Sequence, residues 1–341
     1  MTDLSAITSF TRTAHPALRE ELEKAIAPAG DHGTQELQAM ITYQLGWTGE
    51  NAGPKAEGKL LRALFCLLAC QAAGREWKDA LPAAAAVELI HNFSLIHDDI
   101  EDNSQLRRGR PTVWKIWGEA QAINAGDAIF ALANSSLLNL AETVSLKAAL
   151  KAGKLFHATC LRLTQGQHLD IAFEDQDQVQ LETYWQMVGG KTAALLAFSL
   201  EGGALCAEVD PKIQAHYHDF GHYLGMAFQI QDDILGIWGD EELTGKSTTG
   251  DLITRKKTLP VLYGLAQNGE FAKAWSSGEI KPDNAPRLAE ILDSEGGLAY
   301  AQSSADQMTG LALEALEKAD PQGEAGEILF KTARQLLSRR D

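Results

Sequence analysis

Apolar residues recur at helical spacing along almost every long segment of this 341-residue chain. Leu18, Leu22 and Ile26 lie four residues apart, as do Leu181 and Trp185. This spacing puts apolar side chains on one face of an α-helix, whereas a half-buried strand needs strict alternation. Alternating runs of β-branched residues are nearly absent. The pattern therefore predicts an all-α protein.

Turn signals separate the expected helices, but no linker divides the chain into parts. Gly, Pro, Ser and Asp cluster at residues 52–54, 109–111, 210–211, 245–250 and 281–283. Hydrophobic residues make up 45% of the sequence, which is enough to bury a large core. We therefore predict one domain over residues 1–341, folded as a single large helical bundle.

One short pattern occurs twice: an apolar stretch, a polar residue, Asp-Asp and an aliphatic residue. The first copy covers residues 96–100 (IHDDI), and the second covers residues 230–234 (IQDDI). Side chains on facing helices of a bundle commonly build one site in its core. We therefore expect two apolar helices that end in these clusters and face each other across one cavity.

The acidic residues of the two copies predict a metal site. Asp98 and Asp102 are four residues apart and point the same way on a helix, while Asp99 lies on a neighbouring face. Mg²⁺ binds carboxylate oxygens and takes water and substrate phosphates as its other ligands. A solvated acidic helix end would explain the first cluster equally well if it stood alone. Together with Asp232 and Asp233, it predicts several ions around one diphosphate.

Lysine and arginine residues accompany both acidic clusters. For any one of them, an ion pair with a nearby carboxylate is the alternative explanation. As a set they favour phosphate binding, because Arg binds phosphate oxygens in a bidentate way and Lys acts as a point charge. The residues are Lys59, Arg62, Arg107, Arg108, Lys191, Lys246, Lys256 and Lys257. The pattern predicts a helical cavity with room for two phosphorylated ligands.

The net charge of −16 argues against a nucleic-acid partner, because nucleic-acid binding depends on basic surfaces. The most apolar stretch, residues 60–73, is too short to span a bilayer and contains Arg62, so we expect no integral membrane segment. The N-terminal residues lack the pattern of a signal peptide. Four cysteines without metal-ligand spacing indicate buried, reduced thiols. We therefore expect a cytoplasmic protein.

Six short segments form a specific combination of motifs. They are GKLLR (58–62), DDIED (98–102), RRG (107–109), GKT (190–192), FQIQDD (228–233) and TGK (244–246). Over roughly residues 40–265, the chain resembles the trans-polyprenyl diphosphate synthases, the family of the farnesyl and geranylgeranyl diphosphate synthases. The resemblance implies a fold of the type I isoprenoid synthase kind, with helices around a central apolar cavity.

The same resemblance implies a magnesium-dependent prenyltransferase that joins isopentenyl diphosphate head-to-tail to an allylic diphosphate, and a homodimer. It assigns two Mg²⁺ ions to Asp98 and Asp102 and a third mainly to Asp232. Asp99 and Asp233 are further predicted metal ligands, with Asp233 and Asp240 assisting through water. It assigns the allylic diphosphate to Arg107, Lys191 and Lys246, and isopentenyl diphosphate to Lys59, Arg62, His91 and Arg108. It places Thr192 and Gln229 beside the developing carbocation, with Gln167 and Asp170 as a supporting polar shell.

Two positions depart from the family pattern. Gly236 stands where the second acidic motif often has its third Asp. Because the first Asp of that motif does most of the metal binding in the family, we expect activity to persist. Ala63 follows Arg62 where many relatives have Pro, and we attach no functional consequence to this difference.

Product length should depend on the depth of the cavity below the first acidic cluster. Phe93 and Ser94 lie five and four residues before Asp98, about one helical turn below the metals. Phe93 is either the floor of the cavity or an ordinary core residue. One aromatic residue, a small neighbour and an uninserted DDxxD resemble the geranylgeranyl synthases more than the farnesyl ones. We therefore predict a C20 product, with C15 as the next choice.

Three other functions fit parts of the sequence. His97 and Asp98, with His91 as a further ligand, match the His-Asp pair of a metal phosphohydrolase, but no other histidine has a matching position. A terpene cyclase would share the metal clusters, yet it binds one diphosphate and needs fewer cations. A non-catalytic subunit of a prenyl synthase should have lost an Asp cluster or its cations. Residues 119–129 and 130–140 are apolar enough for a helix–helix interface.

Overall fold

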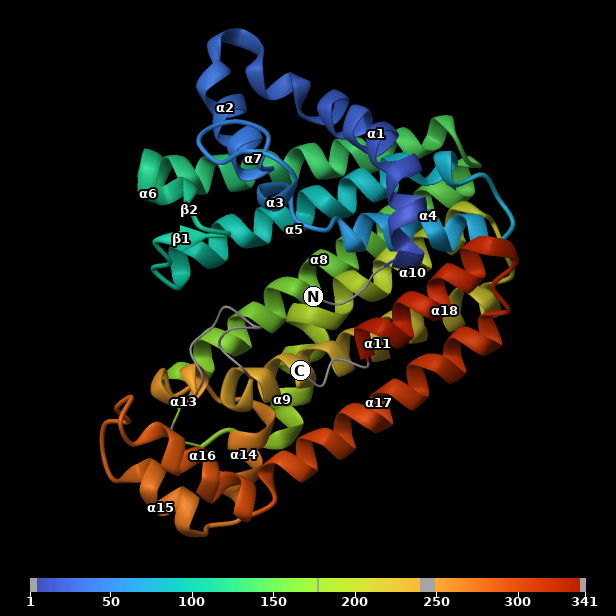
Figure 1. The fold of residues 1–341 in the computed structure, drawn as a ribbon. Coiled ribbons are helices and arrows are strands. Elements are labelled where there is room, and N and C mark those ends of the chain that lie inside the picture. The colour runs from blue at the N-terminus through green and yellow to red at the C-terminus, as the bar shows by residue number, and fades with distance from the viewer. Residues whose placement is uncertain (1–4, 177, 240–248, 338–341) are drawn as a thin grey trace.

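Helices make up nearly all of the regular structure of the protein in a computed structural model, which describes residues 5–176, 178–239 and 249–337 (Figure 1). Strands in these residues are confined to one short antiparallel hairpin, β1 (Leu106–Arg107) and β2 (Arg110–Pro111). The prediction of an all-α fold is confirmed.

The helices follow one another through short connections. The first half of the chain forms α1 (Ser5–Ile26), η1 (Ala27–Gly33), α2 (Gln35–Gln44), α3 (Pro54–Glu57), α4 (Leu61–Ala72), η2 (Trp77–Ala80), α5 (Leu81–Glu101), α6 (Val113–Trp117), α7 (Glu119–Leu138), η3 (Asn139–Glu142) and α8 (Leu146–Glu174). The second half forms α9 (Leu181–Val188), the π-helical turn η4 (Gly189–Ala193), α10 (Ala194–Cys206), α11 (Pro211–Trp238), α13 (Gly250–Ile253), α14 (Leu259–Ala266), α15 (Glu270–Ser276), α16 (Ala285–Ser294), α17 (Gly297–Ala319) and α18 (Gly323–Leu337). Within the described ranges, no helix combines the length and the apolar content that crossing a membrane requires.

The helix α10 lies at the centre of the bundle. All of its side-chain positions except Glu201 are buried. A helix that is apolar on all sides must be covered on all sides, and α4, α8 and α11 pack against it. The contact with α4 is close because a side chain at Gly203 would meet the backbone carbonyl of Cys66. Outside this centre, α5 packs along α7, and α11 packs along α17.

Three clusters of buried apolar side chains fill the part of the molecule that the structure describes. The largest joins α1, α4, α5, α7, α10 and α18. A second cluster lies between α9, α11, α14 and α17. The third belongs mainly to α13, α15 and α16, which gather at the end of the molecule opposite α2 and α6 (Figure 1). The first two clusters therefore support the two helices, α5 and α11, that carry the acidic pairs.

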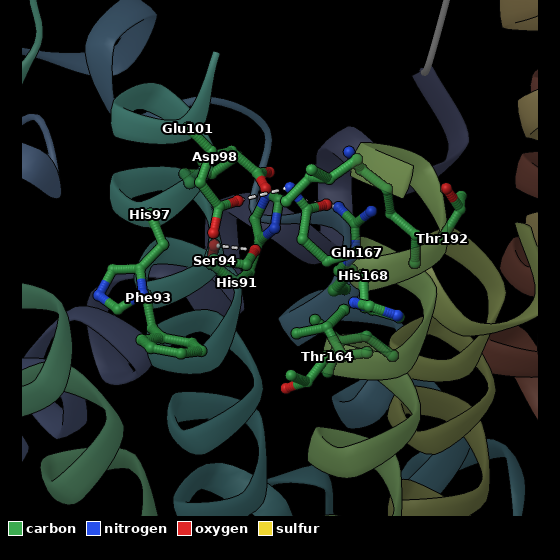
Figure 2. Close-up of a pocket in the computed structure, with 16 residues that line it drawn as sticks. His91, Phe93, Ser94, His97, Asp98, Glu101, Thr164, Gln167, His168 and Thr192 are labelled. Atoms are coloured by element: carbon green, nitrogen blue, oxygen red, sulfur yellow. Dashed lines mark hydrogen bonds between the residues drawn. The ribbon is translucent and has the colours of Figure 1, made fainter. Parts of the chain in front are cut away.

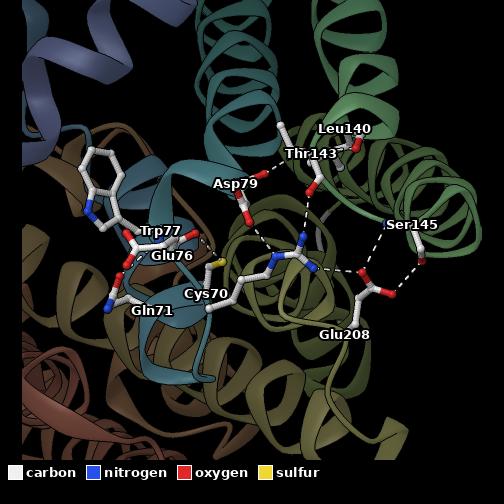
Figure 3. A network of polar contacts seen from close by, with 10 residues as sticks. Cys70, Gln71, Glu76, Trp77, Asp79, Leu140, Thr143, Ser145 and Glu208 are labelled. Carbon is white, nitrogen blue, oxygen red and sulfur yellow. Dashed lines mark hydrogen bonds and ion pairs between the residues drawn. The ribbon is translucent and has the colours of Figure 1, made fainter.

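A polar network ties three connections together at one end of the bundle (Figure 3). Arg75, in the turn after α4, donates to Asp79 at 2.6 Å, to Glu208 at 2.9 Å and to the carbonyl of Thr143 at 2.7 Å. Glu208 in turn accepts a hydrogen bond at 2.7 Å from Ser145, the N-cap of α8. The start of α8 is thereby fixed relative to α4 and α10.

All four cysteines are free and buried, as the sequence predicts. Burial raises the pKa of Cys70 and of Cys160 to about 12. Both side chains are therefore protonated thiols at neutral pH and poor nucleophiles.

Candidate active site

A cavity of about 370 Å³ lies between α5 and α8, beside η4 and α10 (Figure 2). Apolar side chains from α5, α8 and α10 form much of its wall, among them Leu95, Leu163 and Leu195. Many residues predicted from the sequence line the cavity, namely Arg62, His91, Phe93, Ser94, Asp98, Gln167, Lys191 and Thr192. Charged and apolar groups thus meet around one cavity.

The last turn of α5 carries the first acidic cluster to this cavity. Burial raises the pKa of Asp98 to about 6, with Lys191 acting against this shift and Asp102 and Glu101 adding to it. Glu101 accepts a hydrogen bond at 2.6 Å from Gln167 of α8, so the two walls are bridged. Burial and mutual repulsion both disfavour the charged form of these crowded carboxylates. A cation bound between them would stabilise that charged form. The donor set fits Mg²⁺.

The described carboxylates do not by themselves form a complete metal site. Within residues 5–176, 178–239 and 249–337, no three His, Cys, Asp or Glu side chains converge on one ion position. Mg²⁺ commonly binds through one or two carboxylates and completes its shell with water and substrate phosphates. The arrangement suits an ion that enters together with a diphosphate.

Asp99 points away from the cavity. Its side chain is 2% exposed, and both of its carboxylate oxygens accept hydrogen bonds from Arg107 at 2.8–2.9 Å. Arg107 pairs with Arg110 across β1 and β2, and this pairing holds the backbone of Arg107 beside the end of α5. Asp99 therefore anchors the first arginine of the RRG segment.

A second group of cations lies where α4 begins. Arg62 Nη1 is 3.4 Å from His91 Nε2, and Arg108 donates to the carbonyl of Ala56 at 2.6 Å. The buried Glu88 supplies an opposite charge: burial raises its pKa, while Arg62 and Arg108 lower it. Burial and the same two arginines lower the pKa of His91 well below its ordinary value, so the ring is neutral.

Gly58 allows the GK and RRG segments to meet. Its φ is +81°, and a side chain there would lie 2.7 Å from the guanidinium of Arg108. Glycine satisfies both conditions, since it has no Cβ and adopts positive φ readily. Lys59, the next residue, is exposed. Two segments far apart in the sequence are thus adjacent at the rim of the site.

The π-helical turn η4 carries Lys191 and Thr192. A side chain at Gly190 would lie 2.5 Å from a carbonyl of α8, and one at Gly166 of α8 would meet the backbone nitrogen of Lys191. The two backbones therefore touch, and Lys191 Nζ forms an ion pair with Asp170 of α8 at 2.5 Å. Single π-helical turns of this kind are frequent at functional sites.

The second acidic pair lies within α11 and not at its end. The sequence led us to expect a helix end here, but α11 continues beyond Asp233 by more than one turn. Asp233 is 3% exposed and accepts hydrogen bonds from Tyr184, Gln229 and the backbone of Leu259. Burial raises the pKa of Asp233 to about 6 against the effect of these hydrogen bonds. Asp232, its neighbour, is half-buried.

A smaller cavity of about 40 Å³ adjoins the first one at Lys191, which lines both. Asp170, Gln229, Asp233 and Lys256 also line it. Burial lowers the pKa of Lys256, but the charge of Asp233 and of other nearby carboxylates raises it overall. We expected α5 and α11 to face each other across one cavity. The structure instead has two adjoining cavities with Lys191 between them.

Gly236, at the third place of the second motif, lies against the side chain of Asp251. A Cβ built there would collide with the carboxylate of Asp251 in α13. An Asp at position 236 would therefore displace Asp251. Glycine at position 236 thus leaves the carboxylate of Asp251 in place.

Phe93 lies in the part of the large cavity away from the acidic rim (Figure 2). Its ring centroid is 4.6 Å from that of His97 and 5.3 Å from that of Phe130 on α7. Ser94 also lines the cavity. Phe93, the predicted floor, and its small neighbour Ser94 are therefore part of the wall.

The structure brings most of the other predicted residues together as well. Thr192 donates a hydrogen bond to Gln229 at 2.8 Å. Asp240 and Lys246 lie outside the residues that the structure describes.

Sequence reasoning missed Glu88 and Tyr184. Glu88 could have been predicted as a buried counter-charge, because it is the one acidic residue in the Ala-rich apolar run 83–90. No feature of the sequence predicts the role of Tyr184.

Comparison with known proteins agrees with this geometry. The polyprenyl synthetase family model matches residues 51–292. A (2E,6E)-farnesyl diphosphate synthase of Mycobacterium tuberculosis is 39% identical over 309 residues, which cover 87% of this chain and 85% of the relative. A geranylgeranyl diphosphate synthase of the same organism is 39% identical over 292 residues, covering 84% of this chain and 83% of the relative. The structure of a polyprenyl synthetase from Streptomyces coelicolor matches with a TM-score of 0.86 and 33% identity, covering 98% of this chain and 99% of the other.

Proposed function

The chain belongs to the polyprenyl synthetase family and is a short-chain prenyltransferase, and we propose that it condenses isopentenyl diphosphate with an allylic diphosphate to give mainly a C20 product. One observation carries this proposal: α5 presents Asp98 at one part of the cavity and Phe93 at another. A diphosphate held at the acidic end would leave its prenyl tail in the apolar part.

The direct test is incubation with isopentenyl diphosphate, Mg²⁺ and a dimethylallyl, geranyl or farnesyl primer, followed by chain-length analysis. We expect elongated linear products that end mainly at C20. Cyclised products without elongation would indicate a terpene cyclase, and activity only in the presence of a second protein would indicate a regulatory subunit.

Asp98, Asp102 and Asp232 are the proposed ligands of three Mg²⁺ ions. The sequence also predicts Asp99 and Asp233 as ligands, but both use their carboxylate oxygens in buried hydrogen bonds, and we propose that they position neighbouring residues instead. When bound, Mg²⁺ supplies the charge that makes diphosphate a good leaving group.

The cations of the chain hold the two substrates. Lys191 lies between the two cavities, and Asp99 holds Arg107 beside the acidic cluster. These two residues and Lys246 are proposed to bind the allylic diphosphate. The cations at the start of α4 and the neutral His91 are proposed to bind isopentenyl diphosphate, through Lys59, Arg62, His91 and Arg108.

Once the allylic diphosphate departs, the chain must protect a carbocation until the double bond of isopentenyl diphosphate attacks it. Thr192 and Gln229 place side-chain oxygens beside the charge. The apolar walls exclude water, which would otherwise capture the cation. The proton lost in the last step passes to the departed diphosphate.

Phe93 is the proposed floor that limits the product. Phe93→Ala should deepen the cavity, so products longer than those of the wild type are expected in chain-length analysis. Phe330→Ala is the matched control, because Phe330 is partly buried on α18 away from the cavity. Unchanged product length in Phe93→Ala would remove Phe93 as the floor.

Asp232 is the proposed metal ligand of α11. Asp232→Asn should lower kcat/KM by about a hundredfold or more, since one lost charge-stabilising group costs ~10²–10³ in rate. It should also raise the Mg²⁺ concentration needed for half-maximal rate. Asp293→Asn, an exposed position on α16, is the control and should change neither value. An unchanged Mg²⁺ dependence in Asp232→Asn would contradict this role.

Exposed leucines suggest how two copies associate. Leu146, Leu150 and Leu161 of α8 are 60–75% exposed, and their spacing puts them on one side of the helix. Leu138 of α7 is 74% exposed. Apolar patches of this kind mark association surfaces, and we propose a homodimer through α7 and α8.

The reduced, unpaired thiols support a proposed cytoplasmic location.

A further inference from the structure

Asp233 is the centre of a buried hydrogen-bond cluster that joins three helices. Its Oδ2 accepts from the hydroxyl of Tyr184 at 2.7 Å and from the backbone N–H of Leu259 at 3.0 Å. Its Oδ1 accepts from Gln229 Nε2 at 3.0 Å. Tyr184 on α9 is 1% exposed, and Asp233 on α11 is 3% exposed. Both carboxylate oxygens are therefore occupied by donors from the protein.

These contacts fix the direction of a longer chain of hydrogen bonds. Asp233 Oδ1 accepts from the amide nitrogen of Gln229, so Gln229 turns its NH₂ group toward Asp233. The amide oxygen of Gln229 then faces Thr192 Oγ1, 2.8 Å away. Because a carbonyl oxygen only accepts, the hydroxyl of Thr192 must donate to it. The hydroxyl hydrogen is thus directed toward Gln229, which is not among the residues that line the large cavity with Thr192. Figure 2 shows Thr192 at this cavity.

We infer that Asp233 and Tyr184 are positioning residues, which orient Gln229 and Thr192 so that oxygen lone pairs of Thr192 face the reacting allylic carbon. This inference rests on the proposed function. Positive charge develops on that carbon, and dipoles aligned before the reaction stabilise it without reorganisation. If the Gln229 amide were free to turn over, the hydroxyl hydrogen of Thr192 could point into the cavity and oppose the same charge.

Asp233→Asn tests the inference, because an asparagine can donate as well as accept and no longer fixes the amide of Gln229. We expect kcat to fall about tenfold, less than the ~10²–10³ that loss of a direct charge-stabilising group costs. The KM values for both diphosphates and the Mg²⁺ concentration at half-maximal rate should stay within about twofold, because Asp233 contacts neither ion nor substrate in this inference. Calorimetric binding of an unreactive allylic thiolodiphosphate with Mg²⁺ should also be unchanged.

The coupling to Thr192 separates a positioning role from a merely structural one. Thr192→Val removes the end of the hydrogen-bond chain, so adding Asp233→Asn to it should lower kcat by no more than about twofold further. Tyr184→Phe should lower kcat by a smaller factor than Asp233→Asn and should likewise have no further effect in the Thr192→Val background. Thr258→Val is the control for a buried hydroxyl nearby, since Thr258 Oγ1 has no hydrogen-bond partner among the residues that the structure describes.

Two outcomes would overturn the inference. One is a wild-type enzyme that elongates its primer while Asp233→Asn and Tyr184→Phe keep the wild-type kcat. The other is an Asp233→Asn enzyme that needs more Mg²⁺, binds the thiolodiphosphate more weakly and recovers kcat at saturating Mg²⁺, as a metal ligand would. A wild-type chain that does not elongate any primer refutes the proposed function instead, so the two failures are distinguishable.

Discussion

His97 fills the space between α5 and α7 next to the proposed cavity floor. Its ring packs on Phe93, and a side chain at Gly126 would collide with His97 Nε2. Gly126→Ala should therefore push His97 toward Phe93 and make the cavity shallower. We expect a shift to shorter products from the same primer, measured by chromatography of the dephosphorylated alcohols.

The control for this substitution is Gly310→Ala on α17, where an added Cβ meets nothing within 4 Å. It should leave the product distribution unchanged. Longer or unaltered products from Gly126→Ala would mean that His97 does not transmit the change to the cavity.

At the residue scale, the sequence is informative where a site depends on spacing along one helix. Phe93 and Asp98 belong to α5, so the helical period alone puts them within about one turn of each other near the cavity. The directions of Asp99 and Asp233 were not predictable in this way. They depend on Arg107 and Tyr184, which lie on other elements.

At the scale of elements, the contact between α8 and η4 decides where Lys191 lies. Gly166→Ala should force the two backbones apart and destabilise the fold by about 1–3 kcal/mol, as overpacking does elsewhere. It should also lower kcat/KM, because Lys191 moves with η4. Thermal unfolding and steady-state kinetics measure the two effects.

The same helix offers a matched control. Gly153 also lies within α8, and a Cβ there meets nothing within 4 Å. Gly153→Ala should stabilise the protein by about 0.5–1 kcal/mol through helix propensity, with no change in kinetics. Equal stability changes for Gly166→Ala and Gly153→Ala would refute the importance of the α8–η4 contact.

The helices themselves follow from local sequence, but their irregularities do not. Periodic apolar residues predict helices such as α5 and α8. Nothing in the apolar spacing predicts the π-helical turn at 189–193, and its close contact with α8 depends on Gly190 and Gly166, which are far apart along the chain. In the same way, the extension of α11 beyond Asp233 depends on the packing of Ile237 in the third cluster.

For the whole molecule, the exposed leucines of α8 predict the state of association. Leu146→Glu combined with Leu150→Glu should convert a homodimer into monomers, because two charges would be buried without partners in the interface. Light scattering after size-exclusion chromatography measures the mass. Leu106→Glu, at a leucine of β1 that is 63% exposed, is the control. A wild-type monomer, or a dimer that survives the double substitution, would contradict the proposed interface.

The prediction of one domain over residues 1–341 stays a prediction, and α11 gives it physical support. This helix contributes Leu224 to the first buried cluster, Ile230 to the second and Ile237 to the third. Loss of α11 would expose apolar surface in all three clusters at once. The helix that carries the second acidic pair therefore packs in all three buried clusters.

The position of Phe93 on the same helix as Asp98 has a consequence for how product size can change. One turn of α5 advances by about 5.4 Å, which is close to the span of a single isoprene unit. A bulky side chain relocated by one turn would therefore add or remove one whole five-carbon step while the ionic end stayed where it is. Two enzymes whose products differ by one such step would then differ in the position of a bulky side chain on this helix, while their catalytic residues stayed the same.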